Sequence, residues 1–242
     1  MPGIGTINLK VLILDTDYYA VQAINSYLAW DRRTRVTGLV TDTEMLWDHL
    51  RLTAPAEMPD VLLFDADNMG GADTLRAFFQ RLRRFVPTIM VICMVQRIEP
   101  DLVDIAAEMG ASAFLLKHEV QLQITWAICK ALDVDFLVTA NIYRQTRNST
   151  QPRVHDATIL PERRDYPEMG ERTRQAIKLC VIEGMPAHLA ADEMGISLHT
   201  IRGYIKDGYR ILESHDHYEY PTDMTPQERA FMRFTALAEG KS

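Results

Sequence analysis

The sequence predicts an α/β domain with a five-stranded, doubly wound parallel sheet, followed by an all-α domain. Five short apolar runs alternate with stretches of helical periodicity over the first 132 residues. Strands that read as continuous apolar runs are buried on both faces, and their alternation with helices is typical of a parallel sheet covered on both sides. From residue 171 onward the pattern is helical only, which predicts the second domain.

Each predicted strand is followed by a predicted helix. We expect strands where the sequence is almost continuously apolar, over 9–14, 35–40, 60–64, 88–95 and 113–116. We expect helices where apolar residues recur every three or four positions, over 18–30, 43–52, 73–85, 100–110 and 119–132. Right-handed crossovers between parallel strands bring all their carboxyl ends to one edge of the sheet. Open α/β sheets place their ligand sites at that edge.

Composition and charge indicate a cytoplasmic protein with no membrane partner. The chain has 242 residues, 47% of them hydrophobic, and a net charge of −7, which argues against indiscriminate coating of nucleic acid but permits a local basic face. No segment approaches the ~18 consecutive apolar residues of a membrane span, and the N-terminus lacks the build of a signal peptide. Cys93, Cys129 and Cys180 lie far apart in apolar stretches, which favours buried free thiols of a reduced compartment.

The region between the two domains reads as a linker. Residues 146–170 are rich in Pro, Ser, Thr, Asn and charge, and a short helix near 139–147 precedes them. The predicted organisation is therefore a first domain over 1–138, a linker over 139–167 and a second domain over 168–242.

The last predicted helix covers 226–239. Thr225 is followed by Pro226 and Glu228, which is the pattern of a capping box with proline at the first helical position. Phe231, Phe234 and Leu237 form an apolar stripe on this helix, and a stripe of this kind has to be buried. It can pack on the second domain or form a dimer contact.

Charged residues follow three of the predicted strands directly. Asp15 comes after the first strand, Asp65 after the third and Lys117 after the fifth, so we expect these side chains to meet at the sheet edge. The order of strands and these edge residues resemble the receiver domain of bacterial response regulators, over residues 9–132. The resemblance implies a flavodoxin-like fold.

The resemblance also implies roles for individual residues. Asp65 falls on the phosphoacceptor position, Asp15 on the first of two Mg²⁺-binding acids, and Lys117 on the lysine that pairs with the phosphoryl group. Val95 falls on the position of a hydroxyl residue, and Phe114 on that of the switch aromatic. Mg²⁺ suits such a site because a hard cation needs several oxygen ligands.

Several departures from the family pattern predict an atypical receiver. Thr16 stands at the second acidic position, Val95 cannot donate a hydrogen bond, and prolines common after the acceptor and after the lysine are absent. Asp17 or Asp67 could supply the missing carboxylate, although neither lies at the family's position. We therefore expect weak Mg²⁺ binding at Asp15 and Asp65, with no cofactor required.

Residues 188–213 carry the pattern of a helix-turn-helix. Ala191 allows a close helix crossing, Gly195 suits the tight turn, and Ser197 is a natural N-cap for the second helix. Met194, Ile196, Ile201 and Tyr204 are the other pattern positions, of which Met194, Ile196 and Ile201 are the predicted core. The alternative is an ordinary helical hairpin. Over 171–213 the sequence resembles the DNA-binding domain of the NarL/LuxR class, although its usual "LTPRE" opening is replaced by "GERTRQ".

The second helix of this motif enters the major groove in helix-turn-helix proteins. The positions expected to face outward or to reach phosphates are His199, Thr200, Arg202, Gly203, Tyr204, Lys206 and Arg210. Arg202 suits bidentate contact to guanine. Gly203 and Gly208 lie inside this helix and cost up to ~1 kcal/mol each relative to alanine, which predicts a helix that is pliable until DNA orders it.

These features together predict a transcription regulator of the response-regulator type, not an enzyme. It is expected to bind double-stranded DNA as a homodimer, largely independently of phosphorylation. One alternative is a conventional two-component regulator that a histidine kinase or another signalling protein switches through phospho-Asp65. Another is a protein-interaction adaptor that uses the receiver-like domain. A metabolic enzyme is disfavoured because no nucleotide loop of the GxGxxG type follows the first strand.

Overall fold

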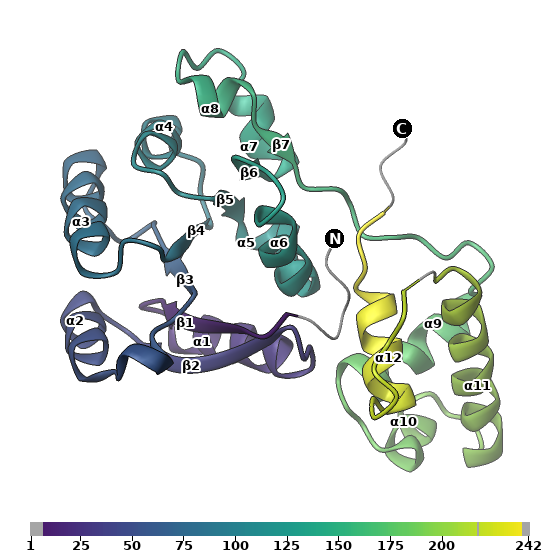
Figure 1. Cartoon of the computed structure of the whole chain (residues 1–242). Helices are drawn as coiled ribbons and strands as arrows, with labels where there is room; N and C mark the ends of the chain where they lie inside the picture. Colours follow the sequence, from purple (N-terminus) through teal and green to yellow (C-terminus); the bar gives the residue numbers. More distant parts are fainter. Residues whose placement is uncertain (1–6, 217, 239–242) are drawn as a thin grey trace. The chain divides into compact units, whose positions relative to one another are not determined.

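The computed structural model describes residues 7–216 and 218–238, which form two compact units (Figure 1). The first unit extends to Leu160 and the second begins at Pro161. Within the described ranges, no helix is long and apolar enough to cross a membrane.

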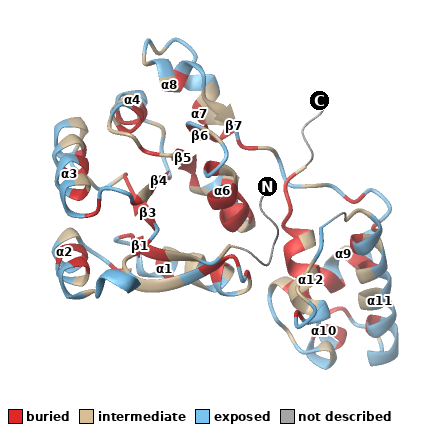
Figure 2. Ribbon diagram, in the orientation of Figure 1, coloured by how far each residue is buried: buried red, intermediate tan, exposed pale blue. Residues whose placement is uncertain are grey.

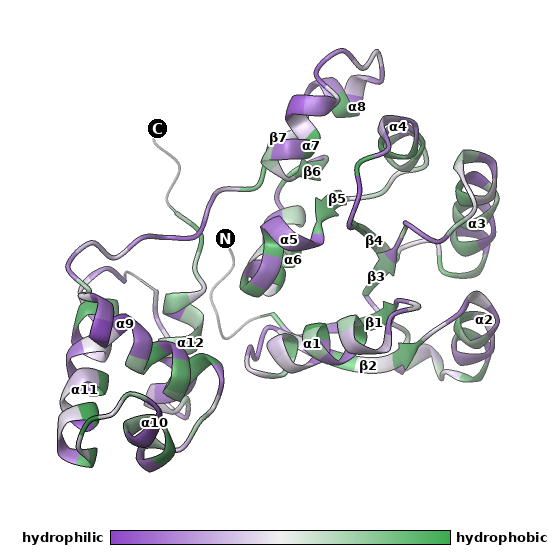
Figure 3. Cartoon of the chain, turned by 180° about the vertical axis from the view of Figure 1, so that it is seen from behind, coloured by the Kyte–Doolittle hydropathy of each residue, from purple (hydrophilic) through white to green (hydrophobic). Residues whose placement is uncertain are grey.

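The first unit is built on one parallel sheet of seven strands in the order β2-β1-β3-β4-β5-β6-β7. The strands are β1 (Leu9–Leu14), β2 (Thr34–Val40), β3 (Val61–Asp65), β4 (Met90–Val95), β5 (Ala113–Leu116), β6 (Leu137–Val138) and β7 (Thr158–Ile159). The predicted fold class is confirmed, but the predicted count of five strands is wrong because β6 and β7 extend the sheet beyond β5. The central strands are almost wholly hydrophobic in Figure 3, as burial on both faces requires.

Helices cover both faces of this sheet (Figure 1). They are α1 (Tyr18–Ala29), α2 (Thr43–Leu52), α3 (Ala72–Phe85), α4 (Pro100–Glu108), α5 (Lys117–Val120) and α6 (Ile124–Ala131), with short 3₁₀ turns at Pro55–Glu57 and Gln121–Gln123. Alternate strand residues such as Leu12, Leu62 and Phe64 share one core with α2, α3 and α4, while α1 and α6 contact each other. The predicted helix over 119–132 is interrupted because Gln121 adopts a positive φ of 43°.

The expected linker over 139–167 is corrected by the structure. Residues up to 160 belong to the first unit, where α7 (Ala140–Gln145) and α8 (Pro152–His155) lie between β6 and β7. Ile142 and Val154 are buried in the sheet's core. The hydroxyl of Thr139 accepts a hydrogen bond from the backbone N–H of Leu116 at 3.2 Å. Elements of two to six residues are too short to show a period, so composition alone suggested a linker.

The second unit contains the predicted helix-turn-helix. Its helices are α9 (Glu171–Ile177), a π-helical turn (Lys178–Ile182), α10 (Ala187–Glu193), α11 (Leu198–Ser214) and α12 (Pro226–Phe234). Ala191, Met194 and Ile201 are buried together between these helices. Gly195 takes a positive φ of 64° in the turn, as the sequence predicts. Ser197 caps α11 by accepting the backbone N–H of Thr200.

The helix α12 packs inside the second unit, which decides between the two predicted places for its apolar stripe. Phe231 and Phe234 are buried, and Figure 2 shows buried positions along α12. The Tyr166 hydroxyl donates to the carbonyl of Arg233 at 2.5 Å, and the Gln227 amide donates to the carbonyl of Cys180 in the π-helical turn at 2.9 Å. The capping box of Thr225 and Glu228 forms as predicted.

The predicted range of this helix is too long at its C-terminal end. The helix ends at Phe234, after which Leu237 pairs with Arg163 in a short antiparallel bridge. Position 239, the predicted end, lies outside the described residues.

Candidate functional site

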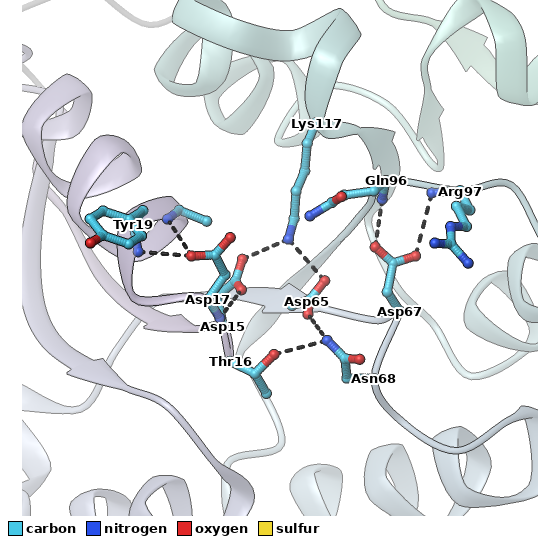
Figure 4. A network of polar contacts seen from close by, with 11 residues as sticks. Asp15, Thr16, Asp17, Tyr19, Asp65, Asp67, Asn68, Gln96, Arg97 and Lys117 are labelled. Atoms are coloured by element: carbon cyan, nitrogen blue, oxygen red, sulfur yellow. Dashed lines mark hydrogen bonds and ion pairs between the residues drawn. The ribbon is translucent and has the colours of Figure 1, made fainter.

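The carboxyl edge of the sheet gathers Asp15, Asp65 and Lys117, as the order of strands predicts (Figure 4). Lys117 Nζ lies 2.7 Å from Asp15 Oδ2 and 2.9 Å from Asp65 Oδ1. The exposed fraction of both aspartate side chains is 3%, and that of the lysine side chain is 15%. One ammonium group therefore bridges two buried carboxylates and offsets only part of their combined negative charge.

Burial and ion pairing act against each other in this cluster. Burial raises the pKa of Asp15, although hydrogen bonds from Lys117 and from the backbone N–H of Asp17 act to lower it. Burial would lower the pKa of Lys117, but the hydrogen bonds with Asp15 and Asp65 outweigh it and raise this pKa. The lysine consequently stays charged, whereas Asp15 holds its negative charge at some cost.

Asn68 completes the cluster and is a residue that the sequence analysis missed. Its side-chain Nδ2 donates to Asp65 Oδ2 at 2.9 Å and to the Thr16 hydroxyl oxygen at 2.8 Å. Because a carboxylate is an acceptor only, the amide nitrogen has to face Asp65. The one available signal was the position of Asn68, in the loop directly behind the predicted acceptor.

The arrangement offers Mg²⁺ few ligands, and the weak binding expected at Asp15 and Asp65 stays a prediction. All four carboxylate oxygens of Asp15 and Asp65 already accept an N–H group, from Asp17, Lys117 or Asn68. Mg²⁺ requires several oxygen lone pairs in octahedral geometry, and Thr16 supplies a hydroxyl where the family carries a second acid. Among the residues that the structure describes, no group of three or more His, Cys, Asp or Glu side chains could hold a metal ion.

Asp17 and Asp67 do not complete this site, which corrects the idea that either one supplies the missing acid. The Asp17 carboxylate caps α1 by accepting the backbone N–H groups of Tyr19 and Ala20. The Asp67 carboxylate accepts those of Gln96 at 2.6 Å and Arg97 at 3.4 Å, in the loop after β4. Both carboxylates therefore accept hydrogen bonds from backbone N–H groups, one at the start of a helix and the other in a loop (Figure 4).

Val95 and Phe114 lie inside the core next to this edge. Val95 ends β4 and is paired in register with Leu116 of β5. The exposed fractions of Val95 and Phe114 are 1% and 0%. Val95 has no polar atom to offer the pocket, and the Phe114 ring is fixed among core residues.

The predicted outward face of α11 is exposed in the structure. The exposed residues among the predicted DNA contacts are His199, Thr200, Arg202, Gly203, Lys206 and Arg210. Tyr204 differs, because it is half-buried and packs against the core of the second unit. Its role as a phosphate contact stays a prediction.

The two glycines of α11 differ in their surroundings. A Cβ atom added at Gly208 would lie 2.5 Å from Cγ1 of Ile177, so this glycine permits the close crossing of α9 and α11. A Cβ atom added at Gly203 would have no heavy atom within 4 Å. Only Gly203 leaves open space on the outward face.

Comparisons with known proteins match both units. No family model matches the chain. The response regulator protein VraR of Staphylococcus saprophyticus is 23% identical over 210 residues, which cover 86% of this chain and 92% of VraR. A solved structure of two RcsB dimers bound to two parallel DNAs is 17% identical, with a TM-score of 0.51, and the match covers 83% of this chain and 89% of that one.

A second RcsB structure, described as the complex of this two-component response regulator with DNA, has a TM-score of 0.50 at 15% identity. That match covers 93% of this chain and 98% of RcsB. At these identities the solved structures show the shared fold. The predicted resemblance to response regulators that carry a NarL/LuxR-type helix-turn-helix domain is confirmed by this relative and this fold.

Proposed function

We propose that the chain is a transcription regulator that binds double-stranded DNA as a homodimer through α11. The observation that carries the proposal is the exposed face of α11, where Arg202, Lys206 and Arg210 lie beside His199 and the open space at Gly203. A helix-turn-helix presents this face of its second helix to the major groove. The RcsB structure of similar fold, in which two dimers are bound to two parallel DNAs, supports the same interpretation.

We propose further that DNA binding does not require phosphorylation. Lys117 and Asn68 already donate to oxygens of Asp15 and Asp65, so a cation at this edge would have to compete with them. Val95 offers no hydrogen bond to a phosphoryl oxygen. The first unit then serves dimerisation or a signal other than phosphate.

Binding to duplex DNA tests the first proposal. Random-site selection with the purified chain gives a duplex, and its affinity is then measured at several salt concentrations. About three phosphate contacts for each of two units predict a slope of log K against log salt near −5. Arg202→Ala with Lys206→Ala should abolish most of this affinity, whereas Arg172→Ala with Lys178→Ala, two exposed basic residues of the same unit, should change it little.

The proposal fails if the Arg202 and Lys206 double variant binds the selected duplex like the parent chain. It also fails if no duplex binds at low salt. A protein-interaction adaptor would give the second result.

A conventional phospho-switch is the second candidate, because Asp65 and Lys117 do lie in contact at the sheet edge. Beryllofluoride with Mg²⁺ separates the candidates. The proposal made here expects the same DNA affinity and the same dimerisation with and without this phosphoryl mimic. A Mg²⁺-dependent change that Asp65→Ala removes would support the switch and a kinase partner.

A further inference from the structure

Asp67 makes an unusual connection between two loops of the first unit. It lies in the loop after β3, yet its carboxylate accepts backbone N–H groups of Gln96 and Arg97 in the loop after β4, at 2.6 Å and 3.4 Å (Figure 4). Both amides follow Val95, the last residue of β4, directly. Two successive N–H groups that point at one anion form a small anion-binding concavity.

The neighbouring residues of Asp67 bind two more parts of the same edge. Asp65 accepts a hydrogen bond from Lys117 after β5. Asn68 donates to Thr16 in the loop after β1. The segment 65–68 therefore contacts the loops after β1 and β4 and the side chain of Lys117. The contacts are made by the side chains of Asp65, Asp67 and Asn68.

We propose that Asp67 is a positioning residue that holds the loop after β4 in one conformation without any added anion. The reason is chemical. The backbone amides of Gln96 and Arg97 lie in an exposed loop, where water would otherwise be their partner, and the Asp67 carboxylate gives them a charged acceptor that belongs to the chain itself. The loop is then already ordered in the protein as it stands.

Amide hydrogen exchange in the full-length chain tests this role residue by residue. Asp67→Ala removes the acceptor, and loss of a hydrogen bond to a charged group should speed exchange at Gln96 and Arg97 at least about tenfold. Asp67→Asn keeps one acceptor oxygen and the side-chain volume, so it should give an intermediate increase. Amides in the middle of β4 should keep their protection in both variants.

Glu99→Ala is the matched control. Glu99 lies in the same loop and loses the same charge, but its side chain makes no capping hydrogen bond to α4. It should leave exchange at Gln96 and Arg97 within about twofold of the parent chain. The proposal is overturned if Asp67→Ala also stays within twofold, or if Glu99→Ala speeds exchange as much as Asp67→Ala does.

A measurement on the parent chain covers the case in which a variant does not fold. Amide protons bound to a carboxylate resonate downfield, so those of Gln96 and Arg97 should do so in the proton–nitrogen spectrum. Random-coil shifts at both positions would overturn the proposal. All these readouts concern the loop itself, so they are independent of whether the chain binds DNA.

Discussion

Lys117 carries the charge balance of the carboxyl edge. Its replacement by methionine should lower the free energy of unfolding by about 3 kcal/mol at neutral pH, because two buried carboxylates would lose their common cation. The pKa of Asp15 is raised, so the folded state binds more protons than the unfolded state above pH ~3.8, and this group's contribution to stability falls as pH rises. Without Lys117 the effect grows.

The stability difference between the parent chain and Lys117→Met should therefore be smaller near pH ~4.5 than near pH ~7.5, since protonation of Asp15, whose pKa is raised, removes one of the two negative charges at the lower pH. In the parent chain the pKa of Lys117 is raised, so its stabilising effect is complete below pH ~10.5. The effect is lost only when the pH rises above the pKa of Lys117 in the folded state. Urea denaturation at each pH measures the free energy of unfolding of both chains. Lys130→Met, outside the cluster, should show no such trend.

At this scale the sequence predicts the members of the ion cluster but not all of their contacts. Parallel topology alone brings Asp15, Asp65 and Lys117 to one edge, so their meeting follows from the order of strands. The directions of Asp67 and Asn68 depend on loop backbone, which no periodic pattern encodes. For that reason the sequence alone indicates neither the contacts of Asp67 nor those of Asn68.

At the scale of the element, replacing each of the two glycines of α11 by alanine should change the free energy of unfolding in opposite directions. Gly203→Ala should raise the free energy of unfolding by up to ~1 kcal/mol, because open space receives the methyl group and helix propensity improves. Gly208→Ala should lower it by about 1–3 kcal/mol, because the methyl group would overlap Ile177. Thermal unfolding of the two variants measures both changes. A change of the same sign in both variants would contradict the packing described for α9 and α11.

The docking of α12 gives a second prediction for an element. Phe231 has an exposed fraction of 2%, and its replacement by alanine should cost about 3–5 kcal/mol of unfolding free energy in the second unit. Phe85→Ala is the control, since 41% of that residue is exposed and the loss should be much smaller. Chemical denaturation followed by circular dichroism separates the two. The sequence predicts this helix and its cap well, because capping depends on neighbouring residues alone.

At the scale of the whole molecule, the first unit needs more chain than its resemblance covers. A fragment of residues 1–160 should unfold cooperatively, because it contains the described part of the first unit. A fragment of 1–138 should unfold at lower denaturant concentration, because it lacks Ile142 and Val154 from the core and leaves β6 unpaired on one side. Equal midpoints would show that the added segment is dispensable. The sequence could not predict this segment, since two-residue strands have no measurable alternation.

The short outer strand β7 has a consequence for how copies of the chain meet. A sheet margin of two residues, Thr158 and Ile159, gives an incoming strand almost no ladder on which to register. Pairing of edge strands between two molecules is therefore disfavoured on that side of the sheet. On this side of the sheet we expect copies of the chain to meet through helical surfaces.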